Sequence, residues 1–363
     1  MAIHEESFRI GSGRYLQGFG YIKRCAEEVL RLGNTPLVIG GVTALSKAER
    51  GIRLSFDAHI SKYEIITYKS TCNDEKAKEI AEYAKTHGFD VIVGVGGGVI
   101  MDFAKLVAHF SALPVINIPT SSATCAAYTP LSVRYTEDGR TVGTLHYKKE
   151  VDCVIADTEI IATEPTRLFL SGVFDSLAKF VEIKHRFSWD MTEYPLGLDY
   201  AYAMSERSFE SLRKLSSVCI SKMSRGIVDA DVENVIFSSI AVPGIISGVA
   251  RGSNQTALGH KFYEGTRFLF PRESSKYLHG EIVGVGLLLQ NHYNGELENN
   301  SELLSLMKEN GMPYRVLDVG VMPSEENLEK YYDYIAGSSA ISRSNADECK
   351  RLREGLEYLF NVK

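Results

Sequence analysis

The stretch Val91-Ile-Val-Gly-Val-Gly-Gly-Gly98 indicates the fold class of this chain. Its first part, Val91–Val95, is an apolar run typical of a parallel strand that is covered on both faces. Three consecutive glycines follow, and Val99–Ala112 then has the pattern of a helix. Glycines let a backbone approach a ligand closely, and the free N–H groups at a helix start attract anions such as pyrophosphate. The stretch therefore predicts a strand, a phosphate-binding turn and a helix, with a plain tight turn as the alternative.

The glycine-rich turn fits neither of the two common phosphate-binding motifs. The pattern G-x-G-x-x-G would need a glycine at position 99, which is Val99, and the P-loop would need Gly-Lys-Ser/Thr. The turn alone therefore does not name the nucleotide.

The segments around this turn alternate between strand-like and helix-like patterns. Pro36–Ile39, Tyr63–Tyr68 and Pro114–Ile118 are apolar or β-branched runs, whereas Asn73–His87 has helical spacing and begins at a capping residue, Asn73. An alternation of this kind predicts a parallel sheet with helices on both faces.

The pattern changes near Pro165, after which strand signals are nearly absent. The sequence predicts helices over 166–186, 195–223, 229–250, 276–296, 300–311, 325–336 and 343–358. We therefore expect two domains: a Rossmann-like α/β domain over 1–162, which binds a dinucleotide, and an all-α domain over 163–363, which binds metal and substrate.

Composition narrows the class of partner. The 363 residues carry a formal net charge of −6 and no run of Lys or Arg, so neither nucleic acid nor a membrane is an expected partner, and a small molecule is. The six cysteines form no CxxC pair, and the first residues lack the pattern of a signal peptide. These features predict a cytoplasmic protein with reduced thiols.

Five ordered motifs resemble those of the iron-containing alcohol dehydrogenase superfamily, in particular its glycerol dehydrogenase-like branch. They are GVGGGVIMDFAK (94–105), IPTSSATCAAYTPLSVRYTEDGR (118–140), GVFDSLAKFVE (172–182), GHKFYEG (259–265) and YLHGEIVGVG (277–286). The resemblance implies a dehydroquinate synthase-like fold, with an α/β domain followed by a helical domain. It also implies a homo-oligomer.

The resemblance places a catalytic divalent metal, Zn²⁺ or Fe²⁺, on Asp175, His260 and His279. The residues themselves agree in part, because a carboxylate among apolar neighbours such as Val173 and Phe174 is costly unless it is paired or bound to metal. One carboxylate and two imidazoles also leave open positions on the cation, as catalysis requires. On the residues alone, Asp175 could equally cap a helix, and the histidines could be structural.

The resemblance also implies a cofactor, NAD or NADP, and assigns residues to it. These are Gly96, Gly97, Gly98, Asp102, Thr120, Ser121, Thr129, Leu131 and Tyr135. For Thr129 and Leu131, positions in a turn and in the core are the alternative. The strand end Val38–Gly41 has no acidic residue to hold the ribose hydroxyls, which predicts that NADP is accepted at least as well as NAD, with Lys47 or Arg50 near its 2′-phosphate.

Two residues bear on the substrate. Cys125 stands where glycerol dehydrogenases usually carry an aspartate, and Tyr263 stands where the family has a second histidine. The sequence of residues 120–133 is similar to that of hydroxycarboxylate dehydrogenases. We therefore expect an NAD(P)-linked oxidoreductase that interconverts a small 2-hydroxy acid and a 2-oxo acid.

Three alternatives remain open at this point. The first is a glycerol or other polyol dehydrogenase, and the second is a relative that binds the nucleotide without catalysis. The third is a dehydroquinate synthase-like carbon–oxygen lyase. Such a lyase needs several basic residues around a phosphate, and the sequence offers no convincing set beyond Lys179 and Lys184.

Overall fold

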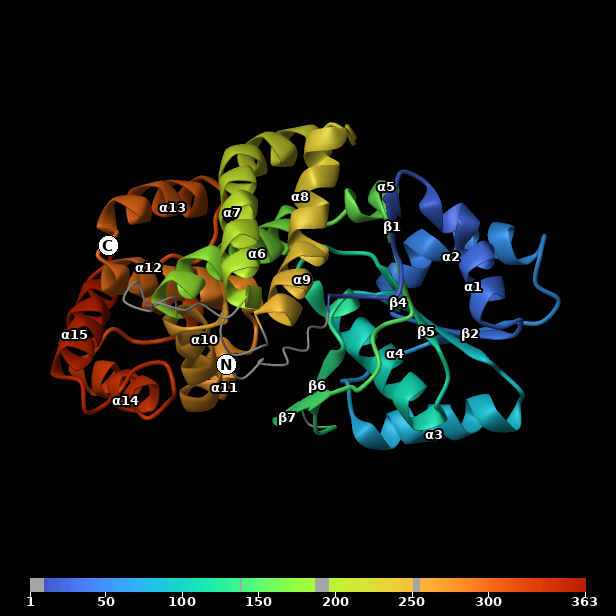
Figure 1. Ribbon diagram of the computed structural model, residues 1–363, viewed down its shortest axis with the longest axis horizontal. Helices are drawn as coiled ribbons and strands as arrows, with labels where there is room; N and C mark the ends of the chain where they lie inside the picture. Colours follow the sequence, from blue (N-terminus) through green and yellow to red (C-terminus); the bar gives the residue numbers. More distant parts are fainter. Residues whose placement is uncertain (1–9, 138, 187–195, 251–254) are drawn as a thin grey trace, which may run out of the picture. The chain divides into compact units, whose positions relative to one another are not determined.

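The computed structural model describes residues 10–137, 139–186, 196–250 and 255–363. The described chain divides into two compact units (Figure 1). An α/β unit comprises the described residues of 10–165 together with 218–244. A helical unit comprises the described residues of 166–217 and 245–363.

A six-stranded sheet, in the order β1-β8-β5-β4-β2-β3, is the centre of the α/β unit, and all of its strand pairs are parallel. The strands are β1 (Tyr15–Gly18), β2 (Pro36–Gly40), β3 (Glu64–Thr67), β4 (Val91–Gly96), β5 (Val115–Pro119) and β8 (Cys153–Asp157). Every residue of β2, β4, β5 and β8 is buried. The apolar runs in the sequence predict this for β2, β4 and β5, whereas β8 was not among the expected strands. The predicted α/β architecture is confirmed.

Helices and a small hairpin complete this unit. They are η1 (Tyr21–Arg24), α1 (Cys25–Leu32), α2 (Val42–Phe56), α3 (Asp74–Thr86), α4 (Gly98–Ser111), η2 (Cys125–Ala127), α5 (Thr158–Ile161), α8 (Ala230–Ile240) and the antiparallel pair β6 (Leu131–Tyr135) and β7 (Thr141–His146). The side chain of Asn73 accepts a hydrogen bond from the Lys76 N–H, so this residue caps α3 as predicted.

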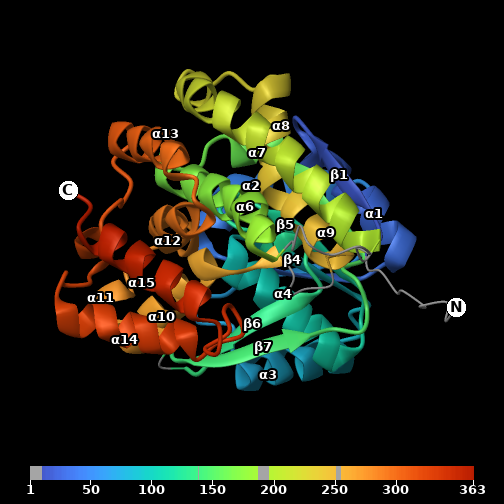
Figure 2. The ribbon, with the colours of Figure 1, turned by 60° about the vertical axis from the view of Figure 1, so that its left-hand side comes forward.

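The second unit is helical throughout its described residues. Its elements are α6 (Thr166–Arg186), α7 (Leu196–Met223), α9 (Val242–Val249), α10 (Leu258–Leu269), α11 (Pro271–Ser274), α12 (His279–Asn294), α13 (Leu297–Glu309), η4 (Val316–Val319), α14 (Glu325–Ala336) and α15 (Ala346–Phe360). Helix α12 is almost entirely buried and packs against α6, α10 and α15, so it forms the core of the unit (Figure 2).

The structure differs from the sequence-based expectations at two helices. One helix was expected over 229–250, but α8 ends at Ile240 and α9 begins at Val242, with Pro243 in its first turn. A proline has no N–H for the helical ladder, which accounts for the break. Helix α10 was not among the predicted helices, because Gly259 and Gly265 lower its helical propensity and its burial against α12 compensates.

The division into units differs from the expected boundary at 162/163. The compact units meet at 165/166, and residues 218–244 group with the α/β unit although they follow it in the chain. Hydrogen bonds explain this grouping, since Gln17 Nε2 donates to the Glu233 carbonyl and Thr158 Oγ1 donates to the Glu233 carboxylate. A change of pattern along the sequence marks one boundary, but it does not show that a later segment, residues 218–244, packs with the earlier unit.

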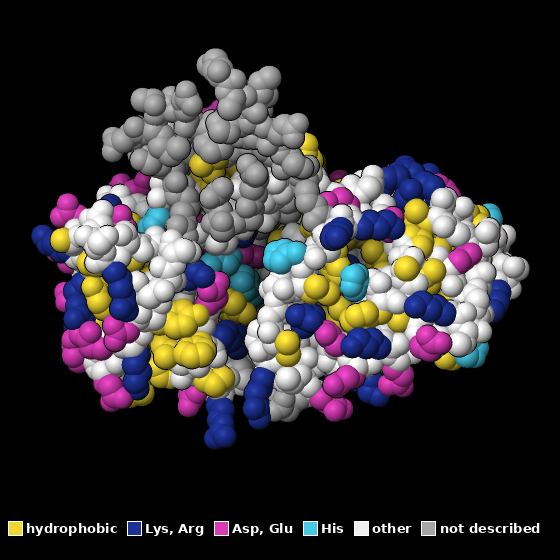
Figure 3. Space-filling view, turned by 60° about the horizontal axis from the view of Figure 1, so that its bottom comes forward, with side chains coloured by type: hydrophobic (Ala, Val, Ile, Leu, Met, Phe, Trp, Pro, Cys, Tyr) yellow, Lys and Arg dark blue, Asp and Glu magenta, His cyan; other side chains and the backbone are white. Residues whose placement is uncertain are grey.

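Charged side chains of both signs lie on the surface of the molecule. On the face drawn in Figure 3, Lys and Arg side chains are interspersed with Asp and Glu. Among the described residues, one helical stretch, Ala230–Val249, has the length and apolar composition to cross a membrane. It is 61% buried inside the structure. This stretch is therefore built into the fold as a pair of core helices.

Candidate metal and dinucleotide sites

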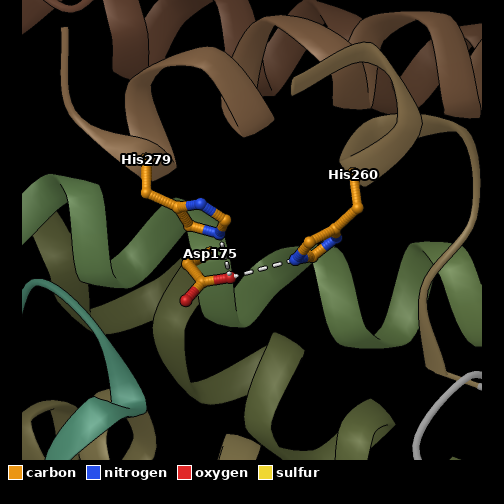
Figure 4. A group of neighbouring side chains, drawn as sticks. All are labelled: Asp175, His260 and His279. Atoms are coloured by element: carbon orange, nitrogen blue, oxygen red, sulfur yellow. Dashed lines mark ion pairs between the residues drawn. The ribbon is translucent and has the colours of Figure 1, made fainter. Parts of the chain in front are cut away.

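The three predicted metal ligands lie together in the helical unit (Figure 4). Asp175 comes from α6, His260 from α10 and His279 from the first position of α12. The Nε2 atoms of His260 and His279 lie 3.4 and 3.3 Å from the same oxygen, Oδ1 of Asp175. One ligand atom from each residue lies within 4.8 Å of the other two. The fold thus brings together a carboxylate and two imidazoles that are far apart in sequence.

Glu182 determines how the His260 ring faces this cluster. Its Oε2 lies 2.5 Å from Nδ1 of His260, and its Oε1 accepts hydrogen bonds from the backbone N–H groups of Ala257 and His260. Because the carboxylate is ionised and accepts only, Nδ1 carries a proton, so the lone pair of the neutral ring is on Nε2, which faces Asp175. A carboxylate behind a histidine in this way is the usual support for a metal ligand.

Close packing of the helices through glycines sets the separation of the ligands. A Cβ on Gly286 of α12 would lie 2.6 Å from the carbonyl oxygen of Gly259 on α10, and one on Gly280 would lie 1.8 Å from the carbonyl oxygen of Ser171 on α6. No side chain fits at either crossing. The glycines of the two histidine motifs therefore hold α6, α10 and α12 close enough for the three ligands to converge.

The start of α12 is fixed by an ion pair. Both carboxylate oxygens of Glu281 accept hydrogen bonds from Arg167 of α6, at 2.5 and 2.7 Å, and Oε2 also accepts one from the Leu278 N–H. His279 is thereby held at the helix N-terminus. The rings of Tyr263 and His279 pack edge to face, with their centroids 4.2 Å apart. Tyr263, expected near the substrate, is thus beside the cluster.

The charges of the cluster fit a divalent cation. Burial alone would raise the pKa of Asp175, but Lys179 and the two histidines outweigh it and hold this pKa well below its usual range. The Asp175 carboxylate is therefore ionised, and its buried Oδ1 has no hydrogen-bond partner. Lone pairs of Nε2 and Oδ1 that face one another repel unless a proton or a metal cation lies between them. The donor set fits Zn²⁺ or Fe²⁺ and leaves coordination positions open.

Protons compete with the metal at this cluster. Burial lowers the pKa of His260, but the carboxylates of Glu182 and Asp175 outweigh it and raise this pKa to about 9. Metal binding therefore releases a proton from His260 at neutral pH.

In the α/β unit, the glycine-rich turn lies between β4 and α4. Cβ atoms on Gly94 and Gly96 would lie 2.5 Å from Ala104 and 2.7 Å from Ile100, so these glycines let the strand and the helix pack closely. A Cβ on Gly97, by contrast, would meet nothing within 4 Å. The backbone at the start of α4 is therefore open to a ligand, as an anion site at a helix N-terminus requires.

Asp102 forms an ion pair and a hydrogen bond within the α/β unit. Its Oδ1 pairs with Lys105 Nζ at 2.9 Å, and its Oδ2 accepts a hydrogen bond from the Val133 N–H. The Lys105 ammonium also donates to the carbonyls of Ala126, Thr129 and Leu131. Asp102 and Lys105 thus anchor the 126–133 segment to α4. The expected contact of Asp102 with a cofactor stays a prediction.

The other residues assigned to the cofactor lie along one continuous stretch of this unit. Thr120 donates its N–H to the Gly96 carbonyl, which places the end of β5 beside the glycine turn. Ser121 follows it, Thr129 is buried, and Leu131 and Tyr135 are the ends of β6. Cys125 begins η2 in the same stretch.

The residues named for NADP lie on α2. Lys47 Nζ donates hydrogen bonds to the carbonyl and the hydroxyl of Thr163, so its ammonium has partners within the protein. Gly41 is the N-cap of α2 and has no acidic side chain next to it in the sequence. The expected acceptance of NADP is untested by this geometry.

Sequence reasoning missed four residues that support these sites. They are Glu182, Glu281, Lys105 and Glu164. Glu182 follows Asp175 by two helical turns, and that spacing on one helix face was a usable signal. Lys105 and Glu281 each have one partner three residues away, but the partners that join them to other segments, and those of Glu164, are distant in the chain and give no local signal.

Comparisons with known proteins show that the chain is an oxidoreductase that acts on CH–OH groups with a dinucleotide of the NAD type. A family model described as iron-containing alcohol dehydrogenase matches residues 12–158. The chain is 30% identical to a glycerol dehydrogenase of Thermotoga maritima over 88% of its length and 86% of that protein. It belongs to the iron-containing alcohol dehydrogenase family, in the glycerol dehydrogenase-like branch. The resemblance predicted from the motifs is confirmed.

Two further comparisons bear on the substrate and on the fold. Hydroxycarboxylate dehydrogenase A of Escherichia coli is 28% identical over 78% of this chain and 76% of that protein. The crystal structure of glycerol dehydrogenase from Schizosaccharomyces pombe superposes with a TM-score of 0.82, covering 98% of this chain and 91% of that one, at 21% identity. This likeness supports the fold over nearly the whole chain.

Proposed function

We propose that this protein oxidises a small polyol such as glycerol, with NAD as hydride acceptor and one divalent cation held by Asp175, His260 and His279. The observation that carries the chemistry is the convergence of both histidine Nε2 atoms on Oδ1 of Asp175, a buried oxygen without a hydrogen-bond partner. The substrate is proposed because proteins named glycerol dehydrogenase recur among the relatives. The comparisons thus favour this alternative over the hydroxy acid that the sequence suggested.

The cation, the residues that orient its ligands and the glycine turn have separate roles in the proposed reaction. A divalent cation supplies Lewis acidity, which lowers the pKa of the alcohol that is oxidised. Glu182 keeps the lone pair of His260 directed at the cluster, while Arg167 and Glu281 hold His279 at the helix start. In the α/β unit, the open backbone at Gly97 receives the pyrophosphate, so that the nicotinamide is held rather than free in solution.

A 2-hydroxy acid is the second candidate substrate. Cys125 supports it, because a site without an aspartate at this position does not repel a carboxylate. The relative named hydroxycarboxylate dehydrogenase A supports it too. We also propose that the cation is Zn²⁺ or Fe²⁺ and that NADP can replace NAD. The same proposal includes assembly into a homo-oligomer and a location in the cytoplasm.

A steady-state assay that follows the absorbance of reduced nicotinamide separates the two substrates. Protein loaded with Zn²⁺ or Fe²⁺ is given glycerol with NAD or NADP, and 2-oxobutyrate with NADH or NADPH. We expect the higher kcat/KM with glycerol and NAD. Faster turnover of the oxo acid would replace the proposed substrate by a 2-hydroxy acid, and turnover of neither would overturn both.

A further inference from the structure

A buried carboxylate lies behind the turn that follows β5. Glu164, between α5 and α6 in the chain, is 7% exposed. Its Oε2 accepts hydrogen bonds from the Ser121 hydroxyl at 2.8 Å and from the Ser122 N–H at 3.0 Å. Its Oε1 accepts one from the Ser122 hydroxyl. Both oxygens of Glu164 are thus committed to two consecutive residues of a single turn.

That turn is joined to the glycine-rich turn by the backbone. Thr120, the residue before Ser121, donates its N–H to the Gly96 carbonyl at 3.0 Å. Thr124, two residues after Ser122, has its Oγ1 3.0 Å from the place of a Cβ on Gly98. The segment that Glu164 holds therefore packs against the start of α4 from both of its ends.

We propose that Glu164 is a positioning residue of the dinucleotide site, which holds the Ser121–Ser122 turn in the geometry that the bound dinucleotide needs. This inference rests on the proposed dinucleotide site but not on the metal or on the substrate. An ionised carboxylate accepts all three hydrogen bonds, whereas a protonated one must donate through one oxygen. Protonation of Glu164 therefore loosens the turn.

The environment of Glu164 makes this change accessible near neutral pH. Burial raises the pKa of Glu164 to about 7, although the hydrogen bonds from Ser122 and Ser121 oppose the rise. The charged group that acts on it is Lys47 of α2, which also lowers the pKa of Glu164. Lys47 itself is bonded to Thr163, the preceding residue, and so stays close to Glu164 when the carboxyl titrates.

Glu164→Gln tests the inference, because glutamine has nearly the shape of the protonated carboxyl. Dissociation constants for NADH are measured by fluorescence titration on the whole metal-free protein, at about pH 8 and about pH 6. The matched control is Glu28→Gln, a buried glutamate of the same unit that is paired with Arg14 and Arg31. This control carries the same chemical change away from the glycine turn.

We expect the wild-type affinity for NADH to fall between pH 8 and pH 6, by about tenfold, the value of one charge-assisted hydrogen bond. Glu164→Gln binds NADH at both pH values with about the affinity that the wild type has at pH 6, and Glu28→Gln follows the wild type. In turnover, Glu164→Gln raises KM for the dinucleotide and leaves kcat nearly unchanged. A residue that only stabilised the fold would not produce this pH profile.

Other results overturn the inference in distinguishable ways. Equal affinities of wild type and Glu164→Gln at both pH values, or equal weakening by Glu28→Gln, would overturn it and leave the dinucleotide site standing. A wild-type protein that does not bind NADH would overturn both. If Glu164→Gln does not fold, Ser122→Ala removes one of the three donors. It must weaken NADH binding and flatten the pH dependence, and a wild-type profile would overturn the inference.

Discussion

Nδ1 of His260 lies 2.5 Å from Oε2 of Glu182, and this contact decides that Nε2 of His260 faces Asp175. Because the buried Glu182 also accepts two backbone N–H groups, it is held in place whether or not a cation is present. The histidine is thus oriented for a metal by the protein itself, and the first prediction concerns this support.

Glu182→Gln weakens metal binding without removing a ligand. We expect its affinity for Zn²⁺ to fall by about 10- to 100-fold, as is usual for the partner of a ligating histidine. Competition with a coloured zinc chelator measures the change. Glu296→Gln, which alters a carboxylate paired with Lys184 in the same unit, serves as the control and should bind Zn²⁺ like the wild type. Unchanged affinity in Glu182→Gln would contradict the orienting role.

Asp175→Asn removes the one negative ligand of the cluster. We expect metal content close to zero after dialysis and a loss of activity of about 10³-fold or more, because the Lewis acid is lost. NADH binding, measured by fluorescence, should stay within twofold of wild type, since the glycine turn lies in the other unit. A variant that keeps its metal and its activity would show that Asp175 is not a ligand.

Gly280→Ala tests the helix crossing that positions His279. A Cβ here would lie 1.8 Å from the Ser171 carbonyl oxygen, so α6 and α12 must move apart. We expect a loss of about 3 kcal/mol or more in the free energy of unfolding, at the upper end for overpacking. Urea denaturation followed by circular dichroism measures it. A stability equal to that of wild type would mean that the two helices are not in this contact.

The stability of the fold should depend on pH through Glu164. Because the folded pKa of about 7 lies above the ordinary value of 4.5, the group's contribution is fully present below pH 4.5 and is lost as the pH rises through 7. Glu164→Gln has no titrating carboxyl at this position, so its stability does not fall in this way as the pH rises. Relative to wild type, the variant should gain up to about 3 kcal/mol between pH 4.5 and pH 8. If the variant instead lost stability relative to wild type between these pH values, the pKa of Glu164 would not be raised.

Cys125→Asp tests the part that this residue plays in substrate choice. An aspartate repels the carboxylate of a 2-oxo acid and can accept hydrogen bonds from a polyol. We expect the ratio of kcat/KM for glycerol to that for 2-oxobutyrate to rise by about tenfold or more. The conservative variant Cys125→Ser should leave that ratio within a few-fold of wild type. No change in Cys125→Asp would place this position outside the substrate site.

The sequence predicts much of this molecule because its strongest signals are local. The apolar run before Gly96 and the cap at Asn73 specify β4 and α3 to within a residue. The motifs around Asp175, His260 and His279 identify three side chains that the fold then brings together. What fails is long-range: α10 is helical because it packs against α12, although its own glycines disfavour a helix.

The supporting carboxylates show the same limit. Glu164 follows α5 with no motif around it, and its partners Ser121 and Ser122 are more than forty residues earlier. Only the folded chain shows that its oxygens are committed to the turn beside Gly96. Likewise, the return of residues 218–244 to the α/β unit depends on contacts of Glu233 with Gln17 and Thr158, which no local pattern contains.

The most direct test of the central claim measures metal content and glycerol oxidation together, in wild type and in His279→Ala. Protein stripped by a chelator is titrated with Zn²⁺ or Fe²⁺, and NADH formation is followed at each addition. We predict that wild-type activity rises in proportion to bound metal and saturates near one ion per chain, while His279→Ala neither retains metal nor turns over glycerol. Full activity of the stripped wild type, or of His279→Ala, would contradict the assignment of Asp175, His260 and His279 as the catalytic metal site.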